Sequence, residues 1–313
     1  MKPTTGNYVF DLHCDTITEC YKRGVGLSHP DLDFSLRKLP EGYHICQCMA
    51  VFIPDNLRGQ GAVRYFDQVA ALFRGQLAEH HEQMALVEDT AGIMHLLDGK
   101  RFAAMLTVEG GAVLAGEVSR VEALHKEGVR MMTLTWNGAN EICGGAATDQ
   151  GFTSFGRQVV AEMENRRMVV DVSHLSDTGF WELCRFAKRP FVASHSNSRA
   201  VCDHRRNLTD GMFGEIRDRG GLVGINYYDS FIREGGGSSD ISDLLRHIHH
   251  FLELGGENTL ALGSDFDGAD MPPYLKGLQC IRPFREALLE SGLSAATVNK
   301  LFFENARRFF APL

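Results

Sequence analysis

The sequence predicts an α/β fold, a (β/α)8 barrel of the TIM type, and two observations lead to this prediction. Short apolar runs recur along the 313-residue chain, and most of them end in a polar residue that precedes a longer segment of helical periodicity. Strands that are apolar almost throughout are buried on both faces, as in parallel sheets, and their regular alternation with helices at this length is typical of the barrel. No linker divides the chain, so we expect one domain over residues 1–313.

Eight apolar runs are the expected strands. They span residues 8–12, 45–53, 102–108, 129–135, 168–173, 191–194, 221–226 and 259–263. The segments between them predict helices near 62–81, 117–127, 155–166, 177–188, 209–219 and 240–254, several of which start at a capping residue such as Ser176 or Asp240. We expect a last amphipathic helix near 294–310 to pack against the barrel or a partner subunit. An open doubly wound sheet is the alternative, but no GxGxxG follows the first strand and no Walker loop occurs.

The composition excludes several classes of protein. The chain has 32 Lys+Arg and 40 Asp+Glu, a net charge of −8, so it lacks the positive charge that nucleic acids and anionic membranes select. It has no apolar run of about 18 residues that could span a membrane, and no apolar core of signal-peptide length near its start. We therefore expect a soluble, cytoplasmic protein. Its 8 cysteines are too sparse for a disulfide scaffold, and we expect Cys46 and Cys48 to be small buried residues of one strand.

Chemically active side chains follow five of the expected strands. In a barrel, the residues just past each strand share one rim, where active sites lie. A single histidine after an apolar strand is more often structural than a ligand, but this many candidates at one rim are hard to explain in that way. They are His13 and Asp15 after the first strand, Glu109 after the third, His174 after the fifth, His195 after the sixth, and Asp265 and Asp267 after the eighth.

These residue types indicate a metal site. Imidazole nitrogens together with carboxylate oxygens suit Zn²⁺ or a similar divalent ion. The set exceeds what one tetrahedral ion needs, which favours two ions ~3.5–4 Å apart that share a water of lowered pKa. Glu109 could reach across as the bridge, and Asp265 is placed to take a proton from that water and pass it to a leaving group. Asp267 has a structural alternative, because it precedes Gly268 and can fix the following turn.

Two arginines follow the sixth strand in the segment from His195 to Asn207. Arg205 and Arg206 come after the rim rather than on an exposed helix. A guanidinium at this place can bind a substrate carboxylate through two parallel hydrogen bonds. We take Arg206 as the candidate for substrate binding.

These motifs resemble those of the membrane (renal-type) dipeptidases, peptidase family M19 of the amidohydrolase superfamily. The resemblance rests on HCDT at the first strand, TVEGG around Glu109, DVSHLS around His174, SHSNSRAVCDHRRN from His195, and GSDFDG around Asp265. The motifs occur in the family's order and run from residue 13 to 267, which covers most of the chain. Single motifs such as HxD are weak signals, but the joint match is specific.

The resemblance implies a (β/α)8 barrel of the amidohydrolase type with two zinc ions. It implies that His13 and Asp15 bind one ion, His174 and His195 bind the other, and Glu109 bridges the two. Asp265 matches the family's acid/base aspartate, and Arg206 matches the arginine that holds the dipeptide's C-terminal carboxylate. The implied substrates are free dipeptides, many with a D-residue at the C-terminal position. The implied reaction is attack of a metal-bridging hydroxide on the peptide carbonyl, with Asp265 protonating the departing amine. A homodimer is common among such barrels.

One position departs from the family pattern. Where the family often has a histidine that contacts the developing oxyanion, this chain has Trp136 in TLTWNGANE. An indole N–H can donate one hydrogen bond but cannot become charged, and losing one oxyanion donor typically costs ~10²–10³ in kcat. Either Trp136 or a neighbour, Asn137 or Asn140, substitutes for the histidine, or the substrate differs. We expect a pocket that is narrower or more apolar than the usual dipeptidase pocket.

Two other functions stay open. The same metals could hydrolyse another small amide, a lactam or a lactone, in which case Arg206 would matter less. Alternatively, the chain could be a pseudoenzyme that keeps its metals for stability or partner binding, although the presence of every expected ligand and of Asp265 argues against this. We expect His247, His249 and His250 to form a solvated helix face, and Tyr227 and Tyr228 to lie near the pocket.

Overall fold

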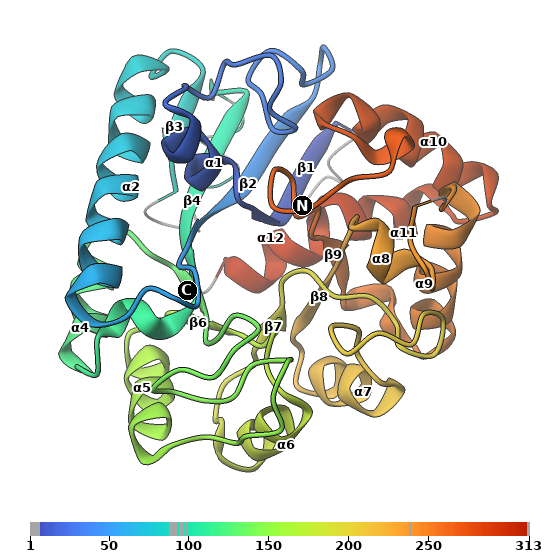
Figure 1. Cartoon of the computed structure of the whole chain (residues 1–313). Coiled ribbons are helices and arrows are strands. Elements are labelled where there is room, and N and C mark those ends of the chain that lie inside the picture. Colours follow the sequence, from blue (N-terminus) through green and yellow to red (C-terminus); the bar gives the residue numbers. More distant parts are fainter. Residues whose placement is uncertain (1–6, 88–92, 94–96, 98, 238, 312–313) are drawn as a thin grey trace.

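The structure, a computed structural model, describes residues 7–311 except 88–92, 94–96, 98 and 238. Its centre is a closed barrel of parallel strands, which confirms the predicted fold (Figure 1). The barrel strands are β1 (Tyr8–Cys14), β2 (His44–Phe52), β4 (Phe102–Glu109), β5 (Met131–Thr133), β6 (Val169–Asp171), β7 (Val192–Ala193), β8 (Leu222–Ile225) and β9 (Leu260–Leu262). They follow the order β2-β1-β9-β8-β7-β6-β5-β4, and pairing of β2 with β4 closes the ring.

One described strand lies outside this ring and was not expected from the sequence. Strand β3 (Met84–Leu86) pairs with the first residues of β4, where Met84 lies opposite Phe102. Strand β5 pairs with the last residues of β4 on the same edge, where Thr133 lies opposite Glu109. Strand β3 therefore occupies an edge that β5 leaves open, and three residues are too few to produce a recognisable sequence pattern.

The predicted helices are confirmed, with ends shifted by a few residues. They are α2 (Gly59–Glu79), α4 (Ser119–Lys126), α5 (Ser154–Asn165), α6 (Asp177–Phe186), α7 (Asp210–Asp218) and α9 (Ile241–Glu253). Helices α1 (Thr16–Arg23), α8 (Asp229–Ile232) and α10 (Ile281–Glu290) were not expected, and short 3-10 turns occur at Gly111–Leu114, Gly256–Asn258, Pro273–Leu275 and Leu278–Cys280. The predicted caps hold, because the Ser176 side chain accepts from a first-turn N–H of α6 and Asp240 forms a capping box on α9. No helix in the described ranges is both long and apolar enough to cross a bilayer.

A buried apolar cluster joins the barrel strands to the last helical segment of the chain. This segment consists of α11 (Ala295–Asn299), a π-helical turn (Lys300–Glu304) and α12 (Asn305–Phe310), and Figure 1 shows α12 beside the barrel. Phe310 stacks on Phe10 of β1 with ring centroids 5.2 Å apart. Cys46 and Cys48 lie in the same buried cluster, as expected. The prediction that this segment packs against the barrel is therefore confirmed.

The prediction of a solvated histidine face on α9 is wrong for His247. Its side chain is fully buried, with the backbone N–H of Ser198 donating to Nδ1 at 3.1 Å and Nε2 donating to the carbonyl of Ile232 at 2.8 Å. Burial lowers the pKa of His247 to about 4. The reason is helical spacing, because His247 shares one face with the buried Leu244 and Phe251. His249 and His250 are partly exposed, as expected.

Candidate active site

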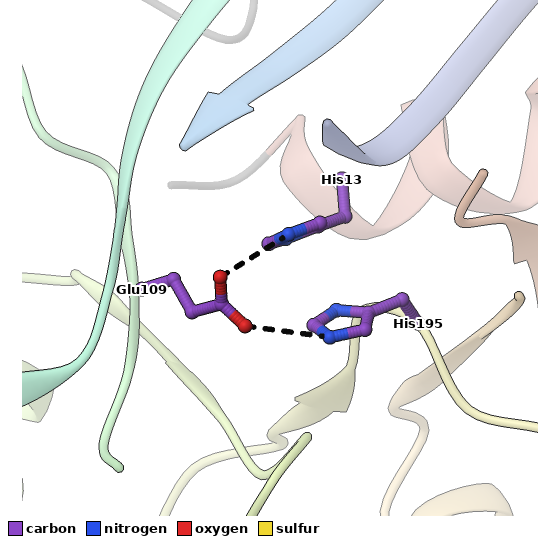
Figure 2. Close-up of side chains that lie close together, drawn as sticks. All are labelled: His13, Glu109 and His195. Carbon is purple, nitrogen blue, oxygen red and sulfur yellow. Dashed lines mark ion pairs between the residues drawn. The ribbon is translucent and has the colours of Figure 1, made fainter. Parts of the chain in front are cut away.

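The barrel topology brings all the predicted rim residues together at the carboxyl ends of the strands. Six of them are buried residues, each with no more than 8% of its surface exposed, whereas Asp267 is partly exposed. Figure 2 shows the side chains of His13, Glu109 and His195 pointing toward one another. The cluster consists of His13 in β1, Asp15 directly after it, Glu109 at the end of β4, His174 after β6, His195 after β7 and Asp265 after β9.

The Glu109 carboxylate faces two groups of side chains with its two oxygens. Oε1 lies 2.8 Å from Nε2 of His174 and 3.6 Å from Nε2 of His195. Oε2 lies 3.7 Å from Nε2 of His13. A carboxylate in this position can contribute one oxygen to each of two neighbouring sites.

The His13 side of the cluster contains polar atoms without partners. Nε2 of His13 lies 3.5 Å from Oδ2 of Asp15 and 3.8 Å from Oδ1 of Asp265. Nε2 of His13 and Oδ1 of Asp15 are buried and have no hydrogen-bond partner. Two overlapping groups in the described residues have ligand atoms close enough to share an ion, namely His13 with Glu109 and His195, and His13 with Asp15 and Asp265.

The hydrogen bonds of His174 and His195 determine which ring nitrogens carry lone pairs. Nδ1 of His174 lies 2.9 Å from the amide oxygen of Asn137, which can only accept, so Nδ1 carries the proton. Nδ1 of His195 lies 2.7 Å from Oγ of Ser194, whose single proton goes to Asp171, so this Nδ1 also carries the proton.

Both Nε2 atoms are therefore lone-pair donors, and they lie only 3.0 Å apart. Two facing lone pairs repel unless a cation lies beside both of them. The site therefore fits a metal ion that is held by His174 and His195.

The protonation states of the clustered side chains also fit a metal site. Burial acts to lower the pKa of His13, but Glu109, Asp15 and Asp265 outweigh it and raise this pKa to about 10. Burial holds the pKa of His174 and His195 well below the usual range, so these rings are neutral. Three buried carboxyl groups thus attract positive charge, and neutral imidazoles are available beside them as ligands.

Asp265 is held in an unusual backbone conformation at the edge of the cluster. Its φ is +65°, in the left-handed region that residues other than glycine rarely adopt, and His174 has a φ of +66°. Burial raises the pKa of Asp265 to about 6, against the lowering effect of His13. Gly268 packs closely here, because a Cβ at this position would lie 2.1 Å from Oδ2 of Asp15.

The hydrogen bonds of Asp267 join distant segments of the chain, which differs from the expected alternative of fixing the turn that follows it. Its carboxylate accepts hydrogen bonds from the Thr16 hydroxyl at 2.5 Å and from the backbone N–H groups of Asp33 at 2.7 Å and Phe34 at 3.1 Å. These bonds attach the loop after α1 to the turn after β9. Asp267 also lines the cavity described next.

A cavity of about 550 Å³ opens above the cluster. One wall is aromatic, since Trp136 packs edge-on against Phe52 with ring centroids 5.1 Å apart and lies 6.2 Å from the His174 ring. Tyr228 and Phe231 also line the cavity, whereas Tyr227 is buried away from it against Phe266. Trp136 and Tyr228 were expected near the pocket from the sequence, whereas Phe52 and Phe231 were not, because they resemble ordinary core residues.

Arg206 borders a second cavity of about 510 Å³ that shares Asn137, Tyr228 and Phe231 with the first. Its guanidinium is buried, donates from Nη2 to the carbonyl of His195 at 3.3 Å, and leaves Nε without a partner. Burial lowers the pKa of Arg206 to about 10, although Glu109 and Asp265 act to raise it. Arg205 lines the same second cavity, but it is exposed and paired with Asp149 at 2.5 Å.

A closed barrel with histidines and carboxylates at the carboxyl ends of its strands defines a metal-dependent hydrolase. The family model of the membrane dipeptidases, peptidase family M19, matches residues 4–312. The chain therefore belongs to this family of metallo-dipeptidases, and the resemblance seen in its motifs is confirmed.

Two curated proteins and one solved structure are similar to this chain over most of its length. A Klebsiella pneumoniae protein described as an uncharacterized protein in the pqqA 5′ region is 31% identical over 249 residues, which cover 76% of this chain and 92% of the relative. An uncharacterized Acinetobacter calcoaceticus protein in the PQQ-III 3′ region is 26% identical over 284 residues, which cover 78% of this chain and 89% of the relative. The fold matches a metallopeptidase from Rhodobacter sphaeroides liganded with a phosphinate mimic of L-Ala-D-Ala, with a TM-score of 0.93, 24% identity, and coverage of 97% of this chain and 98% of that one.

Proposed function

We propose that the protein is a binuclear zinc dipeptidase that hydrolyses the peptide bond of free dipeptides. The observation that carries this proposal is the arrangement around Glu109. One of its oxygens lies beside the facing Nε2 atoms of His174 and His195, while the other faces His13. Membership of the family supports the class of reaction, and the arrangement around Glu109 supports two neighbouring metal sites.

The ligands divide between two ions. His13 and Asp15 would hold one ion, His174 and His195 would hold the other, and Glu109 would contact both. Nitrogen and oxygen ligands of this kind favour Zn²⁺ among the common divalent ions, although Co²⁺ and Mn²⁺ also bind them. When bound, the pair supplies Lewis acidity for the peptide carbonyl and lowers the pKa of a water molecule.

The chain's own residues would orient the substrate and move the proton. Asp265 takes a proton from the attacking water and passes it to the departing amine, a role that suits a buried carboxyl whose pKa is raised to about 6. Arg206 binds the C-terminal carboxylate of the dipeptide, because it is a buried cation with an unpartnered N–H at the cavity. The L-Ala-D-Ala mimic bound to the Rhodobacter protein makes L-D dipeptides the first substrates to test.

Trp136 stands where the family often has a histidine, so another group must donate the hydrogen bond to the oxyanion. Asn140 is committed elsewhere, since its Nδ2 donates to Leu134 and its Oδ1 accepts from Ile142 and Cys143. Asn137 lines both cavities and uses its oxygen for His174. We assign the donor to Nδ2 of Asn137, and Trp136 to an apolar wall that retunes the pocket.

Release of amino acids from a panel of L-L and L-D dipeptides, by protein of assayed metal content, tests the proposal. Strong turnover with about two metals per chain, abolished in Asp265→Asn, is the expected result. Two metals without turnover would favour another small amide, a lactam or lactone, or a pseudoenzyme.

A cytoplasmic location and a homodimer stay predictions from the sequence.

A further inference from the structure

Two buried aspartates lie directly beneath the site, and each holds the ends of two neighbouring strands. Asp11 in β1 is 2% exposed and Asp171 at the end of β6 is fully buried. Oδ1 of Asp11 accepts the backbone N–H groups of His13 at 3.1 Å and Ser264 at 3.1 Å. Oδ1 of Asp171 accepts those of Ser173 at 3.0 Å and Ser194 at 2.9 Å.

The residues that follow these contacts are the rim residues themselves. Ser264 precedes Asp265, Ser173 precedes His174, and Ser194 precedes His195. The two carboxylates therefore fix the backbone from which four of the six clustered side chains project.

Asp171 differs from Asp11 because one of its side-chain partners contacts a histidine ring. Its Oδ2 accepts the hydroxyls of Thr133 at 2.5 Å and Ser194 at 2.6 Å, and Oγ of Ser194 lies 2.7 Å from Nδ1 of His195. Since the serine proton goes to Asp171, the serine oxygen accepts the Nδ1 proton of His195. At the Asp11 position the corresponding hydroxyl, that of Ser264, donates to the carbonyl of His13 and reaches no imidazole.

We propose that Asp171 is a positioning residue that acts through Ser194 to hold His195 in the tautomer whose Nε2 is free to bind a metal. The proposal rests on the metal-binding role given above to His195. Second-layer partners of metal-bound histidines commonly change metal affinity by about 10–100-fold when they are removed.

The isosteric substitution Asp171→Asn tests the direction of the hydrogen bonds that link His195, Ser194 and Asp171. The backbone N–H groups of Ser173 and Ser194 keep the amide oxygen at the Oδ1 position, which places the new NH₂ group against the Ser194 hydroxyl. Ser194 can then donate to Nδ1 of His195 at 2.7 Å or to Oγ of Ser173 at 3.5 Å, and the shorter contact favours Nδ1. The ring proton of His195 then moves to Nε2, where it blocks metal binding. The double variant Asp171→Asn/Ser194→Ala lacks the hydroxyl, so no serine proton can be donated to Nδ1 of His195.

The experiment compares four variants of the full-length, metal-loaded enzyme with the wild type: Asp171→Asn, Ser194→Ala, the double variant, and Asp11→Asn as the matched control. The first measurement is zinc loss to a chromophoric chelator. The second is the ¹⁵N NMR signature of the His195 ring, which distinguishes the two tautomers. Thermal unfolding confirms that each variant folds.

We expect Asp171→Asn to bind at least one zinc about 10–100-fold more weakly and to show the Nε2–H tautomer. The double variant should recover to the level of Ser194→Ala. Asp11→Asn keeps an amide oxygen to accept the N–H groups of His13 and Ser264, and it should leave the His195 tautomer unchanged. Equal effects of Asp171→Asn and Asp11→Asn, or a double variant weaker than Asp171→Asn alone, would overturn the proposal. A wild type that retains no divalent ion would instead contradict the proposed function, and the tautomer comparison would still decide the role of Asp171.

Discussion

Asn226 donates a hydrogen bond from its side-chain amide to Oδ2 of Asp265 across 3.0 Å. Oδ1 of the same carboxyl lies on the other side, 3.8 Å from Nε2 of His13. The two oxygens of Asp265 therefore have different partners, and the one that faces the cluster is Oδ1. We infer that Oδ1 carries the proton in the proposed reaction, and that Asn226 keeps the carboxyl in this orientation.

Replacing Asp265 by Asn should separate proton transfer from binding. We expect kcat for dipeptides to fall by about 10²–10⁴, the usual contribution of a general acid–base group. KM should change little, because the variant keeps the size of the side chain, and kcat is compared at equal metal content because Asp265 belongs to one of the two candidate ligand groups. Steady-state kinetics with parallel metal analysis would check this, and a kcat within threefold of the wild type would contradict the role of Asp265.

Arg206 should matter only for substrates with a free C-terminal carboxylate. Truncating one member of a buried charge pair costs about 2–5 kcal/mol, so Arg206→Met should raise KM for dipeptides by about 100-fold. Dipeptides amidated at the C-terminus should show little difference between the variant and the wild type. Arg205→Met is the matched control, because Arg205 is exposed and already paired with Asp149; equal effects of the two variants would refute the assignment.

Trp136 provides a test of how the pocket has been retuned. An imidazole at this position can donate and can also carry charge, unlike indole. We therefore expect Trp136→His to raise kcat for small dipeptides by about tenfold or more. Trp136→Phe serves as the control, since it keeps an apolar ring against Phe52 and should leave kcat near the wild-type value. No change in Trp136→His would contradict the proposal that Trp136 retunes the pocket.

His247 should make the fold sensitive to mild acid. At pH 7 the ring is neutral in both states. Its pKa is about 4 in the folded protein and 6.5 in the unfolded chain, so between these pH values only the unfolded chain binds the proton. The free energy of unfolding should therefore fall by about 3 kcal/mol more in the wild type than in His247→Asn between pH 7 and pH 4. Urea titrations at several pH values would measure this, with His249→Asn as the control. Parallel pH profiles for wild type and His247→Asn would contradict the prediction.

The barrel and its rim could be predicted because both follow from chain order. An apolar run that ends in a polar residue marks the carboxyl end of a strand, and closure of the sheet brings all such ends to one rim. This is why His13, Glu109 and His195 could be grouped although they are far apart in the sequence.

The remaining features have no comparable signal. Phe52 ends an apolar run, and nothing in its residue type separates a cavity wall from a core position. Asn226 and Ser194 are short polar residues whose importance depends on which rim residue they contact. His247 was misplaced because its charge suggested solvent, whereas the helical spacing placed it inward.

The left-handed backbone at His174 and Asp265 has a consequence for directed evolution of this enzyme. Each such residue stores conformational strain of about 1–3 kcal/mol that the surrounding barrel must offset. Glycine adopts the same backbone without strain, so Asp265→Gly should relieve that strain while removing the carboxyl. A library selected for heat resistance alone would therefore enrich inactive sequences at these positions, and thermostabilisation needs a simultaneous screen for turnover.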